Sequence, residues 1–283
     1  MIKAKGMRLS EFAREAWALS GETTEYKGNW HIDQMCEHLE DVTFERGPRT
    51  LCIANPPGCS TSYHVSVAWP AWAAMQGSAP LQMLTLTYNH MLSRGFARRS
   101  DRIMAECEKD PTRWDSARSR RIASSTGAMM TGLHPRIVVV DSPLDPSDDR
   151  SYTPERLEHT ATFYRQVIRS RGDADRVRRV IAMPRMGSGD LIDHVERNED
   201  DVKVLAFPMT YDANHPHINP DDPRTEDGEL LWPELFTPDM VSSIRRSLLL
   251  RRSDLPRALL QQNIKPDDGN GHGRVTSPCK GSP

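Results

Sequence analysis

The sequence predicts an α/β protein in which a mostly parallel sheet is flanked by helices. Two observations predict this class. Short apolar runs of strand length alternate along the chain with longer segments whose apolar residues recur at helical spacing. A strand followed by a helix and another strand favours parallel pairing, because the helix returns the chain to the same end of the sheet. The 283 residues, 37% of them hydrophobic, are enough for one sizeable core.

Five segments have the length and composition of strands. Each is a short run of mainly apolar residues that ends at a proline or a polar residue. They are residues 50–55, 81–88, 136–141, 178–183 and 203–209. The clearest is RIVVVD, in which four apolar residues, three of them valine, precede Asp141.

Apolar residues recur at helical spacing before, between and after these strands. From Trp30 onward the apolar residues of one helical face are Ile32, Met35, Cys36, Leu39 and Val42. Further helices are predicted at 62–75, 90–109, 154–169, 188–197, 237–250 and 255–262. The N-terminal residues up to Trp17 also show an amphipathic helical pattern.

Composition divides the chain into three parts. Residues 1–27 are predicted to form a helical N-terminal segment, and residues 28–263 carry all the strands. Residues 264–283 are rich in Gly, Pro, Asp and Ser, which is typical of a disordered tail or a linker. Within the second part, the polar stretch 211–229 predicts a long loop.

Charge and cysteine content exclude several functional classes. The net charge of −2 is not that of a polycation, so any binding to nucleic acid must come from local basic patches. The five cysteines are widely spaced and form no CxxC pair, which argues against a zinc site or a disulfide framework and favours a reducing cytosol. No apolar run approaches the ~20 residues of a membrane span, and the N-terminus has no apolar signal core.

The strand at 50–55 leads through PPGCSTS into a helix, which is the order of elements in a phosphate-binding loop. Such a loop needs inward-pointing backbone N–H groups, a lysine for the outer phosphates and a Ser or Thr hydroxyl for Mg²⁺. Gly58 to Thr61 can supply the N–H groups and Ser62 the hydroxyl, but Thr61 stands where the lysine belongs. On this motif alone, a proline-broken turn between a strand and a helix is the more common structure.

Asp141 ends the strand 136–141, where an aspartate that holds Mg²⁺ is expected. In active nucleotide hydrolases a second acid usually follows and orients or deprotonates the attacking water. Here the next residue is Ser142, a poor base at neutral pH. Taken alone, an apolar strand that ends in aspartate is common, and in most proteins that aspartate is structural.

Seven segments between residues 28 and 263 follow one another in a distinctive order. They are WHIDQMCEHL; PPGCSTS with VSVAWPAW; LTLTYNHMLSRGFARRSDR; STGAMMTGLHPRIVVVDSP; MPRMGSGDLIDHV; RTEDGELLWPELF; and ALLQQNIKP. Their order resembles the ATPase portion of the bacteriophage terminase large subunit, the motor of viral genome packaging. The resemblance implies a P-loop NTPase-like fold, and seven ordered segments are more specific than any single motif.

The resemblance also implies roles for individual residues. It implies ATP and Mg²⁺ as cofactors, with Ser62 and Asp141 as the metal ligands. The implied nucleotide-binding residues are Pro57, Gly58, Cys59, Ser60, Thr61, Ser62 and, on the adenine-side helix, His31. Arg185 and Asp190 fall in the segment that couples hydrolysis to movement.

The partners implied by the resemblance are double-stranded DNA, a portal protein, a small terminase subunit and further copies in a homo-oligomeric ring, with no membrane. The implied location is the host cytoplasm, with transient attachment to the procapsid portal. Among several arginine clusters, Arg94, Arg98 and Arg99 are candidates for a trans-acting arginine or a DNA contact. The alternative for each cluster is a solvated helix face balanced by nearby acids.

Three departures from the family pattern bear on catalysis. Thr61 replaces the lysine of the phosphate loop (Walker A), and Ser142 replaces the second acid after the strand aspartate (Walker B). Residues 186–189 lack the His and acidic residues that the family places between the arginine and the aspartate of the coupling segment. The pattern predicts a terminase-like ATPase domain that has lost hydrolysis, with nucleotide binding weak or lost. One alternative is a working motor that borrows a lysine from elsewhere, although Lys27 and Lys109, the only lysines near the matched segments, do not have the required spacing. The other is a non-enzymatic assembly partner or remnant.

Three further features bear on the chemistry of the chain. The family's nuclease needs a carboxylate cluster for two metals, and Asp267 and Asp268 are the only acids after residue 262, so DNA cleavage by this chain is not expected. The pair His215 and His217 could bind a metal, although an ordinary polar loop is the more common setting. Cys59 lies where a helix N-terminus can activate a thiol, but no His/Asp arrangement marks it as a nucleophile.

Overall fold

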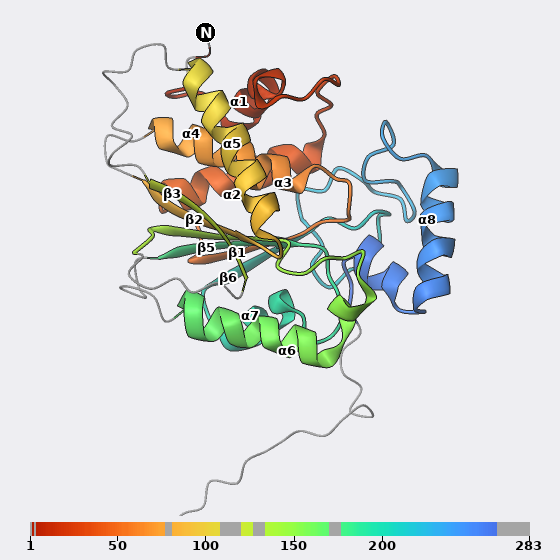
Figure 1. Ribbon diagram of the computed structural model, residues 1–283. Coiled ribbons are helices and arrows are strands. Elements are labelled where there is room, and N and C mark those ends of the chain that lie inside the picture. The colour runs from red at the N-terminus through yellow and green to blue at the C-terminus, as the bar shows by residue number, and fades with distance from the viewer. Residues whose placement is uncertain are drawn as a thin grey trace, which may run out of the picture.

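A six-stranded parallel sheet forms the centre of the computed structural model (Figure 1). The structure describes residue 2 and residues 4–76, 81–107, 120–126, 134–169 and 177–264. The strands are β1 (Thr50–Ala54), β2 (Gln82–Thr87), β3 (Arg120–Ser125), β4 (Ile137–Asp141), β5 (Arg178–Met183) and β6 (Val202–Ala206). Their order is β3-β2-β4-β5-β1-β6, and all five pairings are parallel. The predicted α/β class is therefore confirmed.

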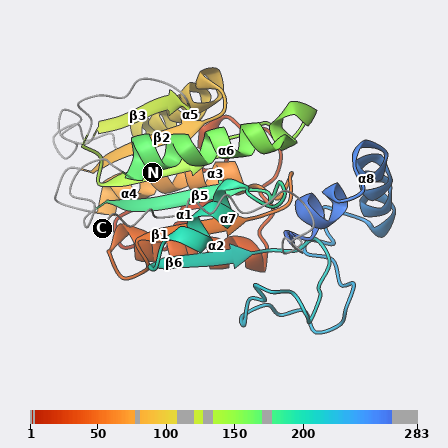
Figure 2. The same cartoon turned by 90° about the horizontal axis from the view of Figure 1, so that it is seen from below.

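Helices cover both faces of the sheet. The helices with α labels are α1 (Leu9–Ala16), α2 (Trp30–Thr43), α3 (Thr61–Tyr63), α4 (Trp69–Gln76), α5 (His90–Cys107), α6 (Pro154–Phe163), α7 (Leu191–Asn198) and α8 (Pro238–Arg251). Helices α1, α2, α4 and α5 lie on one face, and α6 and α7 on the other (Figures 1 and 2). Strands β1 and β4 are buried along their whole length, which explains why their sequences are continuous apolar runs rather than alternating ones.

Five short helical segments of other kinds complete the chain. Two are 3-10 turns, η1 (Ala18–Ser20) and η3 (Asp149–Tyr152), and three are π-helical, η2 (His64–Ala68), η4 (Tyr164–Arg169) and η5 (Pro256–Leu260). Segment η2 joins α3 to α4, so the helix predicted at 62–75 contains a π-helical stretch. Pro70 follows that stretch and has no N–H to donate to a carbonyl one turn earlier, which favours an irregular turn at this point.

Strand β3 was not predicted from the sequence. Its residues, RRIASS, contain one large apolar side chain and no apolar run. It pairs only with β2, at the edge of the sheet, in the register Gln82↔Arg120 to Thr87↔Ser125. An edge strand needs less apolar surface than a central one. Backbone hydrogen bonds to β2, rather than an apolar pattern of side chains, therefore identify β3 as a strand.

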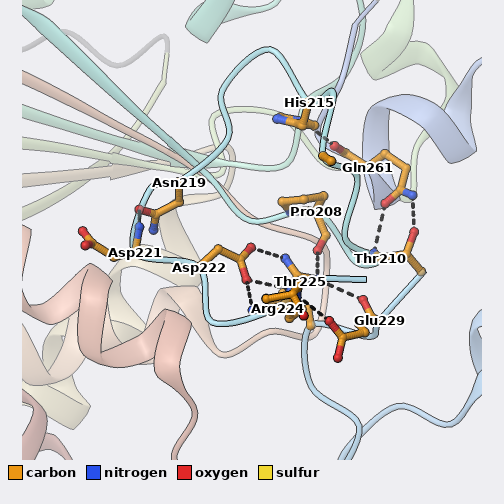
Figure 3. Close-up of polar contacts among 12 residues, drawn as sticks. Pro208, Thr210, His215, Asn219, Asp221, Asp222, Arg224, Thr225, Glu229 and Gln261 are labelled. Carbon is orange, nitrogen blue, oxygen red and sulfur yellow. Dashed lines mark hydrogen bonds and ion pairs between the residues drawn. The ribbon is translucent and has the colours of Figure 1, made fainter. Parts of the chain in front are cut away.

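The predicted loop at 211–229 is ordered around Arg224 (Figure 3). The Arg224 guanidinium donates to both carboxylate oxygens of Asp222, at 3.0 and 2.8 Å, and Nη1 donates to the Pro208 carbonyl at 3.0 Å. Its Cζ lies 5.4 Å from the Trp30 ring centroid and 5.6 Å from that of Tyr211. A single buried arginine thus attaches the loop to α2.

Helix α8 stands apart from the sheet beyond this loop (Figure 2). Leu248 is its one buried residue, and Met240, Ile244, Leu249 and Leu250 are exposed large apolar residues. Among the described residues, no helix combines the length and apolar character needed to cross a membrane.

We expect Arg224→Ala to lower the free energy of unfolding by about 3–5 kcal/mol, because it leaves the Asp222 carboxylate, only 3% exposed, without its counter-ion. Denaturant unfolding measures this change. Arg156→Ala, at an exposed position on α6, is the matched control and should stay within about 0.5 kcal/mol of the wild type. Equal effects of the two substitutions would contradict the role assigned to Arg224.

Candidate functional site

A cavity of about 360 Å³ lies at the edge of the sheet where the carboxyl ends of the strands meet. Parallel α/β sheets usually bind ligands at this edge. Its walls are the turn after β1, the start of the following helix, the end of β4 and the end of β5. The lining residues are Asn55, Pro56, Pro57, Gly58, Cys59, Ser60, Thr61, Ser62, Tyr63, Asp141, Ser142, Pro146, Ala182, Met183 and Pro184.

The turn after β1 is tightly constrained. Gly58 has φ +88°, and a Cβ atom at this position would lie 3.3 Å from Cζ of Phe236. Ser60 has φ 62°, a left-handed conformation that is strained for a residue with a side chain and often occurs at functional sites. Helix α3 begins directly after it, at Thr61. The turn therefore presents its backbone to the cavity at the start of a helix, as an anion-binding loop does.

Asp141 is the charged residue of the cavity, and three serine hydroxyls donate to it. Ser62 Oγ lies 3.0 Å from Oδ1, Ser66 Oγ 2.6 Å from Oδ2, and Ser142 Oγ 3.3 Å from Oδ1. Burial raises the pKa of Asp141, and the three hydrogen bonds oppose that rise by stabilising the carboxylate. The predicted metal ligands Ser62 and Asp141 are thus adjacent oxygen donors.

Thr61 faces Asn55 instead of presenting a cation. Asn55 Nδ2 donates to Thr61 Oγ1 at 2.9 Å and to the Cys59 carbonyl at 3.3 Å, while its Oδ1 is buried without a partner. The cavity lining, which lies wholly within the described part of the chain, contains neither Lys nor Arg. The one acidic side chain of the lining, Asp141, is therefore not balanced by a basic residue in the same lining.

Ser142 has φ 51° and is held by its backbone. Its N–H donates to the Ala182 carbonyl at 2.8 Å, and its carbonyl accepts from the Tyr88 N–H at 2.9 Å. Its hydroxyl donates to Asp141 at 3.3 Å, so this position holds no second carboxylate that could orient or deprotonate a water. The position of the second acid is occupied by a hydrogen-bond donor.

His64 supports the turn from behind. Its Nδ1–H donates to the Ser60 carbonyl at 2.8 Å, and Nε2 accepts from the Tyr26 hydroxyl at 3.2 Å. Burial lowers the pKa of His64 to about 4, so the ring is neutral near pH 7. The hydrogen bond from His64 thus stabilises the left-handed backbone at Ser60.

His31 and Cys59 touch the turn but differ from the expected contacts. His31 is completely buried, its Nε2 lies 3.4 Å from the Cys59 carbonyl, and it does not line the cavity. Burial lowers the pKa of His31 to about 3. Burial also raises the pKa of Cys59 to about 12, so the suggestion of an activated thiol is wrong.

Arg185 and Asp190, the predicted coupling residues, form a buried ion pair. Arg185 Nε lies 2.9 Å from Asp190 Oδ2, and their side chains are 2% and 0% exposed. Asp190 also caps α7, accepting from the Asp193 N–H, and its Oδ2 accepts from the Met186 N–H. The pair fixes the turn between β5 and α7 behind Pro184.

The three candidate arginines of α5 differ in their surroundings. Arg99 pairs with Glu22, donates to Ser20 Oγ at 3.2 Å and lies over the Tyr63 ring. Arg94 and Arg98 are exposed and form no ion pair with any residue that the structure describes. In this conformation Arg99 is engaged within its own chain, whereas Arg94 and Arg98 are available to a partner.

Two residues that complete the site were not identified from the sequence. Ser66, one helical turn after Ser62, makes the shortest hydrogen bond to Asp141, and this four-residue spacing was a usable signal. Asn55 gave no such signal, because its role depends on the fold of the turn.

The histidine pair of the 211–229 loop is engaged within the chain. His215 Nε2 contacts the Gln261 carbonyl, and its Nδ1 accepts from the His217 N–H. No cluster of metal-binding side chains occurs among the described residues.

Comparison with known proteins gives a fold-level likeness. No protein-family model matches the chain, and no curated protein matches its sequence. Among solved structures, the large terminase of bacteriophage HK97 aligns over 93% of this chain and 56% of its own, with a TM-score of 0.52 and 11% sequence identity. The chain thus spans little more than half of that protein's length. At this identity the likeness shows the fold, which is terminase-like.

We expect His64 to make folding sensitive to acid. Its pKa is about 4 in the folded state against an ordinary value of 6.5, so the unfolded chain binds the proton more readily between these values. Stability is then fully present above pH 6.5 and falls by about 1.4 kcal/mol per unit as the pH drops towards 4. Urea unfolding from pH 7 to 4 should show a shallower loss for His64→Gln than for the wild type. His159→Gln, at an exposed site, should follow the wild type; if it also flattened the curve, His64 would not be the cause.

Proposed function

We propose that this chain is a terminase-like motor domain of viral DNA packaging that has lost ATP hydrolysis. One observation carries the proposal: the cavity has the loop, the hydroxyl and the strand aspartate of a nucleotide site, but neither Lys nor Arg lines it. A pseudo-ATPase is expected to keep the fold of the nucleotide site while it lacks the loop lysine and the second acid, here replaced by Thr61 and Ser142.

The donor set of the cavity suits a hard divalent cation. Ser62 Oγ and Asp141 lie 3.0 Å apart, and magnesium prefers such oxygen ligands. These two residues would hold Mg²⁺, and the backbone N–H groups of residues 58–61 would face the phosphates. The bound ion would supply the positive charge that Thr61 lacks, so nucleotide binding should be weak and dependent on the metal.

Turnover requires more than binding. A preorganised stabiliser of the transition state typically contributes about 10²–10³ in rate. Without the loop lysine and the second acid, hydrolysis should be near background. The alternative of a working motor needs a borrowed cation. Lys27 is directed to the Glu234 carbonyl at 3.5 Å and does not line the cavity, and Lys109 lies outside the described residues.

The partners of the domain follow from the same likeness. We propose double-stranded DNA, a portal protein, a small terminase subunit and copies of the chain in a ring, in the host cytoplasm. The exposed guanidinium groups of Arg94 and Arg98, which form no ion pair with the described residues, support a contact with phosphates that does not depend on base sequence.

A second candidate function is an assembly partner without any turnover. The exposed apolar side chains of α8 favour it, because such surface on a helix commonly marks an interface. Co-purification with an intact large subunit or a portal protein would favour this function over the first.

We expect Thr61→Lys/Ser142→Glu to hydrolyse ATP with Mg²⁺ at least about 10²-fold faster than the parent, because it restores both missing groups. Phosphate release with and without DNA measures the rate. The matched control carries the same two changes plus Asp141→Asn and should be inactive. Rapid, DNA-stimulated turnover by the parent chain would refute the loss of hydrolysis. If neither the parent nor the double variant bound nucleotide, the likeness would concern the fold only.

We expect Arg94→Ala/Arg98→Ala to weaken DNA binding and to reduce the slope of log K against log salt by about 2, one for each lost phosphate contact. Fluorescence anisotropy with a duplex of arbitrary sequence measures both quantities. The control, Arg156→Ala/Arg165→Ala, removes the same charge from the opposite face of the sheet and should keep the wild-type slope. An equal loss in both variants would indicate a bulk-charge effect and contradict a contact at α5.

A further inference from the structure

A second cavity, of about 330 Å³, lies beside α7 and has no role in the proposed nucleotide site. It is formed by one side of α7, the loop before Ile218 and the last described residues of the chain. The lining residues are Arg185, Asp193, Glu196, Arg197, Asn214, Pro216, His217, Arg257, Gln262, Asn263 and Ile264. Met183 and Pro184 line the first cavity and Arg185 the second, so the end of β5 separates the two spaces.

The guanidinium of Arg185 has an unused donor. The Arg185 side chain is 2% exposed, and its Nε is bonded to Asp190, but Nη2 is buried without any hydrogen-bond partner. A buried donor without an acceptor costs about 1–3 kcal/mol, and more when it is charged. Such a group in a cavity wall calls for an acceptor that the chain itself does not provide.

The carboxylates in the same wall are already occupied. Asp193 pairs with Arg197 at 3.0 Å and accepts the Gly189 N–H at 2.7 Å, and Glu196 contacts His217 at 3.2 Å. Both also attract Arg185 electrostatically, but neither accepts a hydrogen bond from its Nη2.

Arg257 is another cation of the wall, and its side chain forms no ion pair with any described residue. It is exposed at the cavity, and its guanidinium donates to the neutral Asn263 side chain at 3.3 Å. Beside it, Gln262 is completely buried with φ 52°, and its Oε1 accepts the Arg185 N–H at 2.9 Å. The backbone is thus held in a strained form where it meets Arg185.

We propose that this cavity binds a small anion through Arg185 and Arg257. A phosphate or carboxylate group suits the two guanidinium groups, because both offer planar donors that match its oxygens. Arg185 Nη2 has no acceptor, and Arg257 forms no ion pair with any described carboxylate. The size of the cavity admits a small metabolite or a free anion but not a nucleic acid duplex. This site is independent of the proposed function.

The histidine in the wall gives a local readout. His217 lines the second cavity and not the first, so its ring resonance in a spectrum of ¹³C-histidine-labelled protein reports on this site even if phosphate also enters the loop cavity. His217→Gln assigns the signal. Titration with inorganic phosphate, and separately with acetate, at constant pH and matched ionic strength distinguishes the two classes of anion. We expect the His217 signal to shift saturably with at least one of them.

Three substitutions test the residues. Arg257→Ala, at an exposed position, should weaken the apparent affinity by about tenfold, as expected for one charged hydrogen bond. Arg185→Lys keeps the charge but removes Nη2, and should weaken binding similarly while its fold is checked by circular dichroism. Arg246→Ala, an exposed arginine of α8 outside the cavity, is the matched control and should bind as the wild type does.

Two results would overturn the proposal. One is a His217 signal that moves only as matched chloride moves it. The other is a shift that Arg257→Ala leaves unchanged, which would indicate an adventitious ion. Ser62→Ala removes a ligand of the loop cavity and should leave the His217 titration intact. Failure of nucleotide binding and failure of anion binding at α7 are therefore observed separately.

Discussion

The hydrogen bonds from three serine hydroxyls to Asp141 hold the candidate site together. They join the end of β4 to the helix that follows the turn after β1, and so bring two strand ends into one cavity. A carboxylate this deeply buried would otherwise be expelled or protonated. Each donor opposes the rise in the pKa of Asp141 that burial causes, and it also orients the carboxylate. The stabilisation of the charged form and the shape of the cavity therefore have the same cause.

The central part of the fold could be predicted from the sequence because strands buried on both faces have continuous apolar sequences. The apolar runs that became β1 and β4 are covered by helices on both faces, and nothing polar interrupts them. Strand β3 and the loop around Arg224 have no such apolar sequence. Strand β3 depends on its pairing with β2. The loop depends on Arg224, which contacts the Pro208 carbonyl and the Trp30 ring only in the folded chain.

The site shows a similar division. The sequence placed Thr61, Ser62, Asp141 and Ser142 around one cavity because a strand-turn-helix order constrains where the turn must lie. The sequence could not predict that Asn55 would engage Thr61, or that His31 would face the interior, because both depend on the path of the side chain. The absence of a cation was visible in the residues themselves. Its consequence, a cavity in which no basic residue lies opposite the acidic side chain, required the geometry.

The position of β1 in the sheet also bears on how the chain can assemble. β1 pairs with β5 and β6 and with no strand that precedes residue 178, although it is the first strand in the sequence. Such distant pairings carry a large loop-closure cost and form slowly. During synthesis, β1 and the turn that follows it must therefore wait for their partner strands until β5 has left the ribosome. A chain interrupted before β5 would expose an unpaired apolar strand, a state prone to aggregation.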